Sequence, residues 1–252
     1  MRPVVALTGG SGGIGRAAAA AFARSGFAVL IAGRDAAALA QAEAEAARAA
    51  AGAPGAPAPA LATLAADLAA PGGASAVVDT AVRRFGRLDV LVSGAAVTGP
   101  LRRPLWEVTD DAWQAVLDAN LTAAWRTAAA ALRHAIAAGT PLRLVQVSSG
   151  IARGAVAGLG PYGVSKWALE GLSAALAADA ERAPVAVTVV TVRPPSVRSA
   201  MTRAWLPEAE AARLPGPEIV APALLEAAIA PRERVHGRVL RVAPDGAIEM
   251  LG

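Results

Sequence analysis

The stretch that decides the fold is Val4-Val5-Ala6-Leu7-Thr8-Gly9-Gly10-Ser11-Gly12-Gly13-Ile14-Gly15. Its apolar half is typical of a buried strand, and an alanine-rich helix is predicted over about 16–25. A strand, a glycine turn and a helix in this order are the context that a phosphate-binding loop requires. Gly9 permits a tight turn, Gly13 lets the backbone approach a diphosphate, and Gly15 lets helix and strand pack closely. Because the helix N-terminus offers free N–H groups to an anion, the stretch predicts a dinucleotide-binding βαβ unit.

The rest of the chain repeats the alternation of strand and helix. This pattern predicts one Rossmann-type, doubly wound α/β domain over residues 1–252, with a seven-stranded, mostly parallel sheet flanked by helices on both faces. The Pro/Ala/Gly segment 52–60 is interpreted as a surface loop rather than a domain boundary, and 196–217 as a substrate-loop segment. The further predicted strands cover 27–32, 61–66, 88–92, 142–147, 185–192 and 239–243.

Composition excludes several classes of protein. The longest uncharged run, Ala49 to Ala66, contains three prolines and two glycines, so no membrane-spanning helix is expected. Cysteine is absent, which excludes disulfides and thiolate metal sites, and we predict no metal. The formal charge is +4, but the arginines are scattered singly among acids, so nucleic-acid binding is not expected. Without a visible signal peptide, the expected location is the cytoplasm.

The end of the second predicted strand bears on the choice of cofactor. It reads Gly33-Arg34-Asp35, close to where the adenosine ribose lies in dinucleotide folds. A guanidinium at Arg34 can hold a 2′-phosphate bidentately, which favours NADP(H) and leaves NAD(H) possible. The alternative is that Arg34 pairs with Asp35 in solvent.

Two residues that occur once in the chain stand four positions apart. Tyr162 is the only tyrosine and Lys166 the only lysine. On a helix this spacing places both side chains on one face, about one turn from each other. A nearby ammonium favours the phenolate of a tyrosine and lowers its pKa. The pair therefore predicts a tyrosine prepared by a lysine to move a proton.

With these motifs the chain resembles the short-chain dehydrogenase/reductase family over essentially its whole length. Thr8-Gly9-x-x-x-Gly13-Ile14-Gly15 is similar to that family's cofactor loop, and Tyr162-x-x-x-Lys166 to its active-site signature. Asn120, the only asparagine, stands at the position of the family's helix asparagine, and Ser149 at that of its catalytic serine.

The resemblance implies a role for each member of this tetrad. Tyr162 exchanges a proton with the substrate oxygen while hydride passes between the nicotinamide and the carbonyl carbon. Ser149 donates a hydrogen bond to that oxygen, and Lys166 also binds the nicotinamide ribose. Asn120 bends its helix and anchors a water that links Lys166 to bulk solvent. The resemblance also implies cofactor contacts from Gly9, Ser11, Gly13, Ile14, Gly15, Arg34, Asp67, Leu68, Ser93, Tyr162, Lys166, Val197 and Ser199.

The chain departs from the family pattern at three places. Ser93-Gly94-Ala95-Ala96 replaces Asn-Asn-Ala-Gly, which puts that loop's usual hydrogen bonds in doubt. Pro194-Pro195 replaces Pro-Gly, and a second proline removes an N–H and fixes φ. Gly12 stands where many NADP-preferring members carry a basic residue, so the prediction of NADP(H) depends mostly on Arg34.

The expected function is that of an NADP(H)-dependent oxidoreductase, a carbonyl reductase or alcohol dehydrogenase acting on a small molecule. The alternatives are an NAD-dependent alcohol dehydrogenase, and a non-catalytic cofactor-binding regulator or scaffold on the same fold. By resemblance, a homodimer or homotetramer is expected to form through helices near 109–138 and 166–180. The substrate depends on segments 96–104, 151–160 and 196–217, whose residue types predict a mostly apolar pocket with some arginine.

Overall fold

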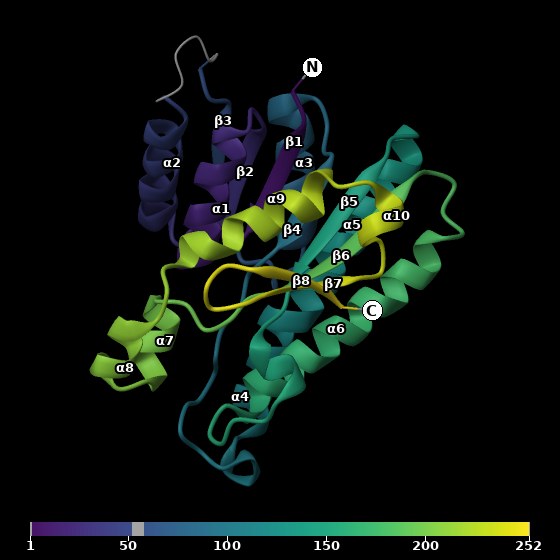
Figure 1. The fold of residues 1–252 in the computed structure, drawn as a ribbon. Coiled ribbons are helices and arrows are strands. Elements are labelled where there is room, and N and C mark those ends of the chain that lie inside the picture. Colours follow the sequence, from purple (N-terminus) through teal and green to yellow (C-terminus); the bar gives the residue numbers. More distant parts are fainter. Residues whose placement is uncertain (1, 52–57, 252) are drawn as a thin grey trace.

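The computed structural model describes residues 2–51 and 58–251 and contains an eight-stranded sheet in the order β3-β2-β1-β4-β5-β6-β7-β8 (Figure 1). The first seven strands are parallel, and β8 pairs antiparallel with β7. The strands are β1 (Val4–Thr8), β2 (Ala28–Gly33), β3 (Leu61–Ala65), β4 (Val90–Ser93), β5 (Leu142–Val147), β6 (Val187–Arg193), β7 (Val239–Val242) and β8 (Ile248–Leu251). The Rossmann-type prediction is confirmed.

Helices cover both faces of this sheet. One face carries α1 (Gly13–Arg24), α2 (Ala36–Ala50) and α9 (Ala221–Ile229), and the other carries α3 (Gly73–Phe85), α5 (Ala123–Ala138) and α6 (Gly160–Ala180). Figure 1 shows α9 crossing the near side of the strands. The remaining helices are η1 (Leu105–Glu107), α4 (Asp110–Leu117), η2 (Asp118–Thr122), η3 (Gly150–Arg153), α7 (Ala200–Trp205), α8 (Glu208–Arg213), η4 (Pro217–Val220) and α10 (Arg232–Val235).

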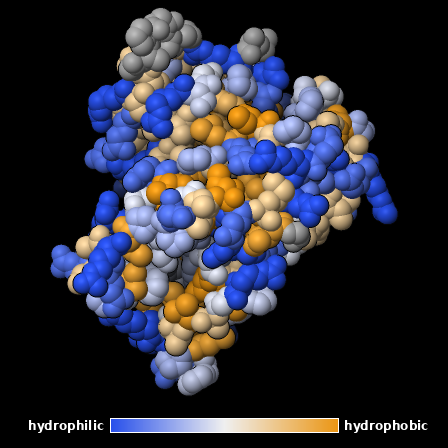
Figure 2. Space-filling model, viewed as in Figure 1, coloured by the Kyte–Doolittle hydropathy of each residue, from blue (hydrophilic) through white to orange (hydrophobic). Residues whose placement is uncertain are grey.

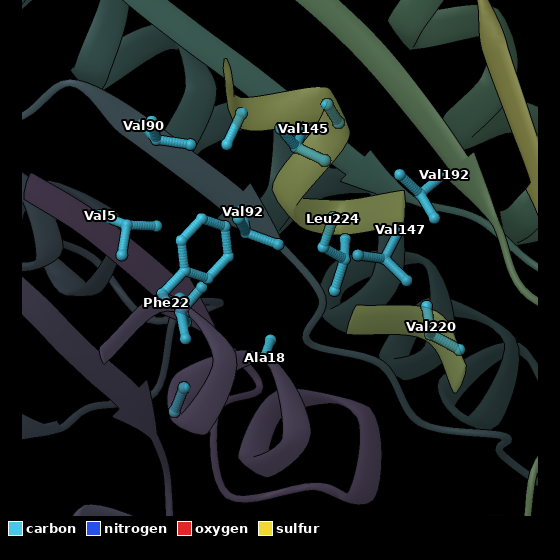
Figure 3. Packing of buried hydrophobic residues seen from close by; sticks show 14 of the residues in the cluster. Val5, Ala18, Phe22, Val90, Val92, Val145, Val147, Val192, Val220 and Leu224 are labelled. Carbon is cyan, nitrogen blue, oxygen red and sulfur yellow. The ribbon is translucent and has the colours of Figure 1, made fainter. Parts of the chain in front are cut away.

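The two core layers follow from the alternation of side chains along each strand. On β1, Val5 and Leu7 pack against the α1 face, while Val4 and Ala6 pack against the α3 face. Figure 3 shows the Phe22 ring of α1 lying among valines of the sheet. Most of the helical residues in both layers are alanines, which lets helix and sheet approach closely.

The sheet has one strand more than the sequence predicts. The missed strand, β8, is a four-residue edge strand that is half exposed, so it lacks the apolar run that marks the other strands. It forms by pairing with β7 across the turn at Gly246, which has φ +90°. Arg241 and Glu249 face each other across this pair with a 2.6 Å ion pair. Pairing rather than local composition therefore makes this strand.

Two further predictions concern the connections. The predicted substrate-loop segment 196–217 contains the short helices α7 and α8. Residues 52–57 of the predicted surface loop lie outside the described part of the chain. None of the helices in residues 2–51 and 58–251 combines the length and the apolar character needed to cross a bilayer. On the face drawn in Figure 2, hydrophobic and hydrophilic residues are interspersed.

The sheet order also positions the functional edge. The chain winds outward from β1 in both directions, through β2 and β3 on one side and β4 to β6 on the other. In open parallel sheets the crevice at such a reversal, outside the carboxyl ends of the strands, is where ligands bind. The segments that follow β1, β2, β4, β5 and β6 therefore meet at one edge.

Candidate active site

The loop after β1 has the geometry that its glycines predict. Gly9 has φ +69°, and a Cβ there would lie 2.7 Å from the backbone of Gly94 and Ala95. A Cβ on Gly15 would lie 2.3 Å from the carbonyl oxygen of Gly9, so only glycine lets α1 start this close to the turn. A Cβ on Gly13 would meet nothing closer than 3.5 Å, because this residue faces the crevice. The N-terminus of α1 therefore opens into the crevice, where its N–H groups can receive an anion.

A cleft of about 300 Å³ lies over this loop and extends between the ends of β1, β2 and β4. We call it the dinucleotide cleft. The residues predicted to contact a cofactor that line it are Gly9, Ser11, Gly13, Ile14, Gly15, Arg34, Asp67, Leu68, Val197 and Ser199. The donor groups of the α1 N-terminus and the glycine cradle fit a dinucleotide diphosphate.

Arg34 lies in the wall of the dinucleotide cleft without a protein partner among the described residues. Its neighbour Asp35 is used elsewhere: the carboxylate caps α2 by accepting from the N–H groups of Ala37 at 2.9 Å and Ala38 at 3.0 Å. The pairing of Arg34 with Asp35, considered as an alternative above, is therefore not formed. By contrast, Arg16 is held by Glu45 at 2.8 Å and by the carbonyl of Ser11 at 3.0 Å. Arg34 is thus a cation available to a ligand.

Ser93 ends β4, at the place in the chain that the sequence predicts, and its contact with a cofactor stays a prediction. Its side chain is buried beneath the cleft, lines neither cavity, and leaves its Oγ unpaired among the described residues. The backbone of Gly94 and Ala95 lines the cleft instead. This loop is held by Thr8, whose Oγ1 accepts from the N–H of Gly94 at 3.1 Å. Thr8 therefore supplies part of the bonding that the altered loop sequence puts in doubt, and the sequence offered no signal for this beyond its place in the motif.

A second cavity, of about 390 Å³, adjoins the dinucleotide cleft. We call it the substrate cavity. The two share walls, including Ile14, Ala96 and Met201, so they form one continuous recess. Ser149, Tyr162 and Lys166 all line the substrate cavity. The structure thus brings together three residues that the sequence singles out, from two different elements: the end of β5 and the first turns of α6.

Lys166 is almost completely buried, with 2% of its surface exposed. Its Nζ donates to the carbonyl oxygen of Val147 at 2.9 Å and lies 5.8 Å from the centroid of the Tyr162 ring. Burial lowers the pKa of Lys166 from 10.5 to about 8, because an ammonium in a dry environment loses its hydration. The one hydrogen bond to a carbonyl holds the side chain in the cavity wall.

The pKa of Tyr162 differs from the expectation that Lys166 lowers it. Burial raises this pKa, and a hydrogen bond with the side chain of Ser149 offsets only part of the rise. The physical reason is that the phenolate would lose more hydration than the nearby groups of the protein return. Tyr162 is therefore held in its protonated form at neutral pH, in contact with the hydroxyl of Ser149.

Asn120 lies behind the site rather than in its wall. It is fully buried in η2, a π-helical turn between α4 and α5, where the resemblance implies that it bends its helix. Its Oδ1 accepts from the N–H of Val97 at 2.7 Å, and its Nδ2 donates to the carbonyl of Val97 at 2.8 Å and to Ser165 Oγ at 2.9 Å. Asn120 thus joins a wall of the dinucleotide cleft to α6, one residue before Lys166. The water that it is expected to anchor stays a prediction.

The walls of the substrate cavity are mostly apolar. Most of them come from the three segments that the sequence marks as substrate-facing, and Pro195 directly precedes the third segment, but the individual residues could not be selected from the sequence. The side chains that close the cavity are Thr98, Ile151, Ala155, Val156, Leu159, Pro195, Met201 and Trp205. The expectation of some arginine in this pocket is wrong: within the described part of the chain, no arginine and no acidic residue lines the cavity, and its single cation is Lys166.

Comparison with known proteins shows the family of the chain. The family model for short chain dehydrogenases matches residues 3–210. The chain belongs to the short-chain dehydrogenase/reductase family. Among curated relatives, an uncharacterised NAD-dependent oxidoreductase of Mycobacterium tuberculosis is 40% identical over 125 residues, which are 50% of this chain and 44% of the relative.

Two other short-chain dehydrogenases/reductases resemble the chain over a greater length. The short-chain reductase protein NovJ of Streptomyces niveus is 35% identical over 79% of this chain and 70% of its own. The crystal structure of a single-residue variant of the actinorhodin polyketide ketoreductase with NADPH has a TM-score of 0.83 at 25% identity and covers 96% of both chains. The chain spans about half the length of the first curated relatives that it matches.

Proposed function

We propose that this short-chain dehydrogenase/reductase is an NADP(H)-dependent oxidoreductase that interconverts a ketone or aldehyde with the corresponding alcohol. The observation that carries the proposal is the convergence of Ser149, Tyr162 and Lys166 on a cavity that opens into the dinucleotide cleft. A carbonyl group in the substrate cavity can therefore meet both a proton donor and a bound nicotinamide.

The residues of the chain act on the substrate oxygen. When bound, the nicotinamide cofactor supplies or accepts the hydride at the substrate carbon. Tyr162 holds a proton at its phenol oxygen and passes it to the substrate oxygen, and the hydroxyl of Ser149 donates a second hydrogen bond to the same atom. Burial raises the pKa of Tyr162, so the phenol holds its proton until the substrate oxygen takes it. Lys166 places a positive charge next to the phenol as its proton leaves.

Arg34 supports NADP(H) over NAD(H). A guanidinium without a protein partner at the end of β2 can pair with a 2′-phosphate, whereas a carboxylate at this place would accept from a 2′-hydroxyl. The relatives differ: the ketoreductase structure contains NADPH, and the Mycobacterium tuberculosis relative is named NAD-dependent. The preference of this chain therefore depends on its own residues.

The lining of the substrate cavity supports a neutral, apolar substrate. A carboxylate or phosphate entering it would lose its hydration and find no arginine among the residues that line it. Turnover of a neutral bicyclic ketone, such as 1-tetralone, can be compared with that of the same ketone carrying a ring carboxylate. We expect kcat/KM to favour the neutral ketone by at least about 100-fold, the scale of an unpaired buried charge. Equal values would contradict the neutral class.

A panel of ketones and aldehydes, assayed with NADPH and NADH, tests the central proposal with wild type and Tyr162→Phe. We expect turnover by wild type and loss of turnover by the variant, with NADPH binding retained by both. Tight NADPH binding by wild type without turnover of any substrate would favour the non-catalytic regulator.

Assembly into a homodimer or homotetramer remains part of the proposal. The two helices that the sequence singles out, α5 and α6, carry the half-exposed side chains of Trp125 and Trp167. Exposed aromatic side chains are typical of protein interfaces. Light scattering coupled to size-exclusion chromatography measures the assembly, and a monomer at micromolar concentration would contradict it.

A further inference from the structure

A buried carboxylate lies on α6 one turn beyond Lys166. Glu170 shares the helix face of Tyr162 and Lys166, and 8% of its surface is exposed. It does not line the substrate cavity or the dinucleotide cleft. A charged side chain is placed in such an environment only when it is paired and hydrogen-bonded, so its partners indicate what it does.

The first partner of Glu170 is the end of β6. Arg193, itself buried, donates to both carboxylate oxygens, from Nε to Oε1 at 2.8 Å and from Nη2 to Oε2 at 2.7 Å. Such a two-point contact fixes orientation as well as distance. Because Pro194 and Pro195 follow directly and line the substrate cavity, the ion pair sets where this wall begins.

The second partner is the residue before the predicted catalytic serine. The Oγ of Ser148 donates to Oε1 of Glu170 at 2.7 Å. The backbone adds one hydrogen bond on each side of Ser149. The N–H of Ser148 donates to the carbonyl of Val192 at 2.8 Å, and the N–H of Gly150 donates to the carbonyl of Pro194 at 3.1 Å. Ser149 is thus held in a frame closed by the ends of β5 and β6 and by the Glu170 carboxylate.

The segment after Ser149 is tied to the same helix. Arg153, at the end of η3, donates to Oε2 of Glu170 at 3.2 Å, and its guanidinium lies 5.7 Å from the centroid of a Trp167 ring. The indole Nε1 of Trp167 donates to the carbonyl of Ile151 at 3.1 Å. The residues on both sides of Ser149 are therefore bound to the helix that carries Tyr162.

The charge of Glu170 is satisfied within this cluster. Burial alone would raise its pKa, but the hydrogen bonds from Arg193 and Ser148 and the charges of Arg193 and Arg153 outweigh burial and hold the pKa below its usual value. No described contact joins the carboxylate to Lys166, whose hydrogen bond goes to Val147. Glu170 is therefore a fixed anion that joins elements and not the counterion of the lysine.

We propose that Glu170 is a positioning residue that sets the hydroxyl of Ser149 against the phenol of Tyr162, through Ser148 and Arg193. The proposal rests on the proposed function for its kinetic readout. It predicts that loosening the cluster lowers kcat without weakening the binding of the cofactor. The cluster contacts the residues on either side of Ser149 and does not line the dinucleotide cleft.

Single variants test this with the intact protein and its best ketone substrate. We expect Glu170→Gln, which keeps the shape and removes the charge, to lower kcat by about 10- to 100-fold, the range for a displaced catalytic group. We expect Ser148→Ala, which leaves the ion pair between Glu170 and Arg193 in place, to lower kcat by about three- to tenfold. We expect the Kd for NADPH of both variants to stay within about twofold of the wild-type value, because neither change removes a contact with the cofactor.

A matched control comes from the same helix. Ser173, one turn further along α6, accepts a buried hydrogen bond from Thr191 of β6 at 2.7 Å. Ser173→Ala therefore removes a buried hydroxyl hydrogen bond between α6 and the sheet that does not involve Glu170. We expect it to lose stability much as Ser148→Ala does while kcat stays within about twofold. If Ser173→Ala lowered kcat as much as Ser148→Ala, the effect would be general to the fold and the positioning role would be wrong.

A double variant separates positioning from stability. Replacing a buried ion pair by apolar residues of similar volume often preserves stability, so Glu170→Leu with Arg193→Met is expected to melt within a few degrees of wild type. The proposal expects kcat to stay low in this stable protein. Recovery of kcat together with stability would overturn it.

Hydrogen exchange gives a readout that does not need turnover. We expect the amides of residues 149–154 to exchange faster in Ser148→Ala and Glu170→Gln than in Ser173→Ala, because the loop loses its tie to α6. Unchanged exchange in this segment would overturn the proposal even if wild type reduced no ketone, in which case the proposed function would fail separately.

Discussion

Lys166 lies under the ring of Tyr162, with Nζ 5.8 Å from the ring centroid, but it donates its hydrogen bond to the carbonyl of Val147 and not to the phenol. The two side chains therefore interact through charge and packing before any ligand joins them. Because both are buried, each resists ionisation: burial lowers the pKa of Lys166 and raises that of Tyr162. In the folded protein, the neutral forms of Lys166 and Tyr162 are therefore more favoured than they are in side chains exposed to water.

This relationship predicts that Lys166 costs stability at neutral pH. Its pKa falls from 10.5 in the unfolded chain to about 8 in the folded one, so between these values the unfolded state binds more protons. Stability from this group therefore rises with pH across that window and is lowest below about pH 8. We expect Lys166→Met to be more stable than wild type at pH 7, by up to about 3 kcal/mol, with a smaller gain at pH 10. Urea unfolding of both proteins at the two pH values measures the difference.

The comparison between the two proteins cancels the other titrating groups, since both contain them. A gain of equal size at pH 7 and pH 10 would mean that packing, and not the charge of Lys166, causes it. Loss of stability at pH 7 would mean that the hydrogen bond to Val147 is worth more than the burial of the ammonium.

Arg34 predicts the cofactor preference. Arg34→Ala removes the cation from the wall of the dinucleotide cleft and leaves the α2 cap at Asp35 in place. We expect the KM for NADPH to rise about 10- to 100-fold, which corresponds to the loss of a charge-assisted hydrogen bond to phosphate. The KM for NADH should change by less than about threefold, because NADH has no 2′-phosphate. Arg48→Ala, an exposed arginine further along α2, is the matched control and should change neither. Equal effects on both cofactors would contradict contact with the 2′-phosphate.

The features that sequence predicted well are those set by neighbouring residues. The glycine loop and the Tyr162–Lys166 pair follow from a strand–turn–helix order and from helical spacing, which hold whatever the rest of the fold does. The contacts of Thr8 and Ser93 were harder to predict, because hydrogen bonding at the end of a strand depends on which strand lies next to it. The β8 strand was missed for the same reason: its four residues form a strand only by pairing with β7.

The walls of the substrate cavity and the Glu170 cluster lie beyond local pattern. Glu170 and Arg193 are 23 positions apart and meet because α6 packs along β6. Trp205, the last residue of α7, lines the same cavity as Ser149 and Tyr162, which belong to elements far from it in the chain. In both cases the types of residue could be read from the sequence, whereas their contacts required the relative placement of separate elements.

A strained residue in the 98–104 loop leads to another prediction. Arg102 has φ +59°, the one positive φ outside glycine in the described chain, and its N–H donates to the carbonyl of Gly158 at 3.0 Å. Its guanidinium donates to the carbonyl of Trp205 at 3.1 Å, which joins the 98–104 loop to α7. A Cβ on Gly158 would lie 2.7 Å from the Cα of Arg102, and Gly158 itself has φ +79°.

Gly158→Ala should therefore separate these loops. We expect a loss of about 1–3 kcal/mol in the free energy of unfolding, the usual cost of a side chain at positive φ together with a backbone clash. The KM for the ketone should rise more than the KM for NADPH, because the affected loops border the substrate cavity. Gly171→Ala on α6, where a Cβ meets nothing within 4 Å, is the control and should be neutral or slightly stabilising. A similar loss in both variants would show that the contact at Arg102 does not matter.

Asn120 and Ser149 should differ in what their removal costs. Asn120 is fully buried and uses its amide in three hydrogen bonds, to both backbone groups of Val97 and to Ser165. Asn120→Ala removes all three hydrogen bonds and leaves a space in the buried η2 turn, although Ser165 keeps its bond to the carbonyl of Tyr162, so we expect a loss of about 2–5 kcal/mol in unfolding free energy. Ser149→Ala removes a hydroxyl that lines the substrate cavity, where its absence should cost less than about 1 kcal/mol but lower kcat by about 100-fold. Chemical denaturation and steady-state kinetics on the two variants measure both quantities. The assignment of Asn120 to the scaffold and Ser149 to the chemistry fails if Asn120→Ala keeps its stability, or if Ser149→Ala loses stability in proportion to its loss of kcat.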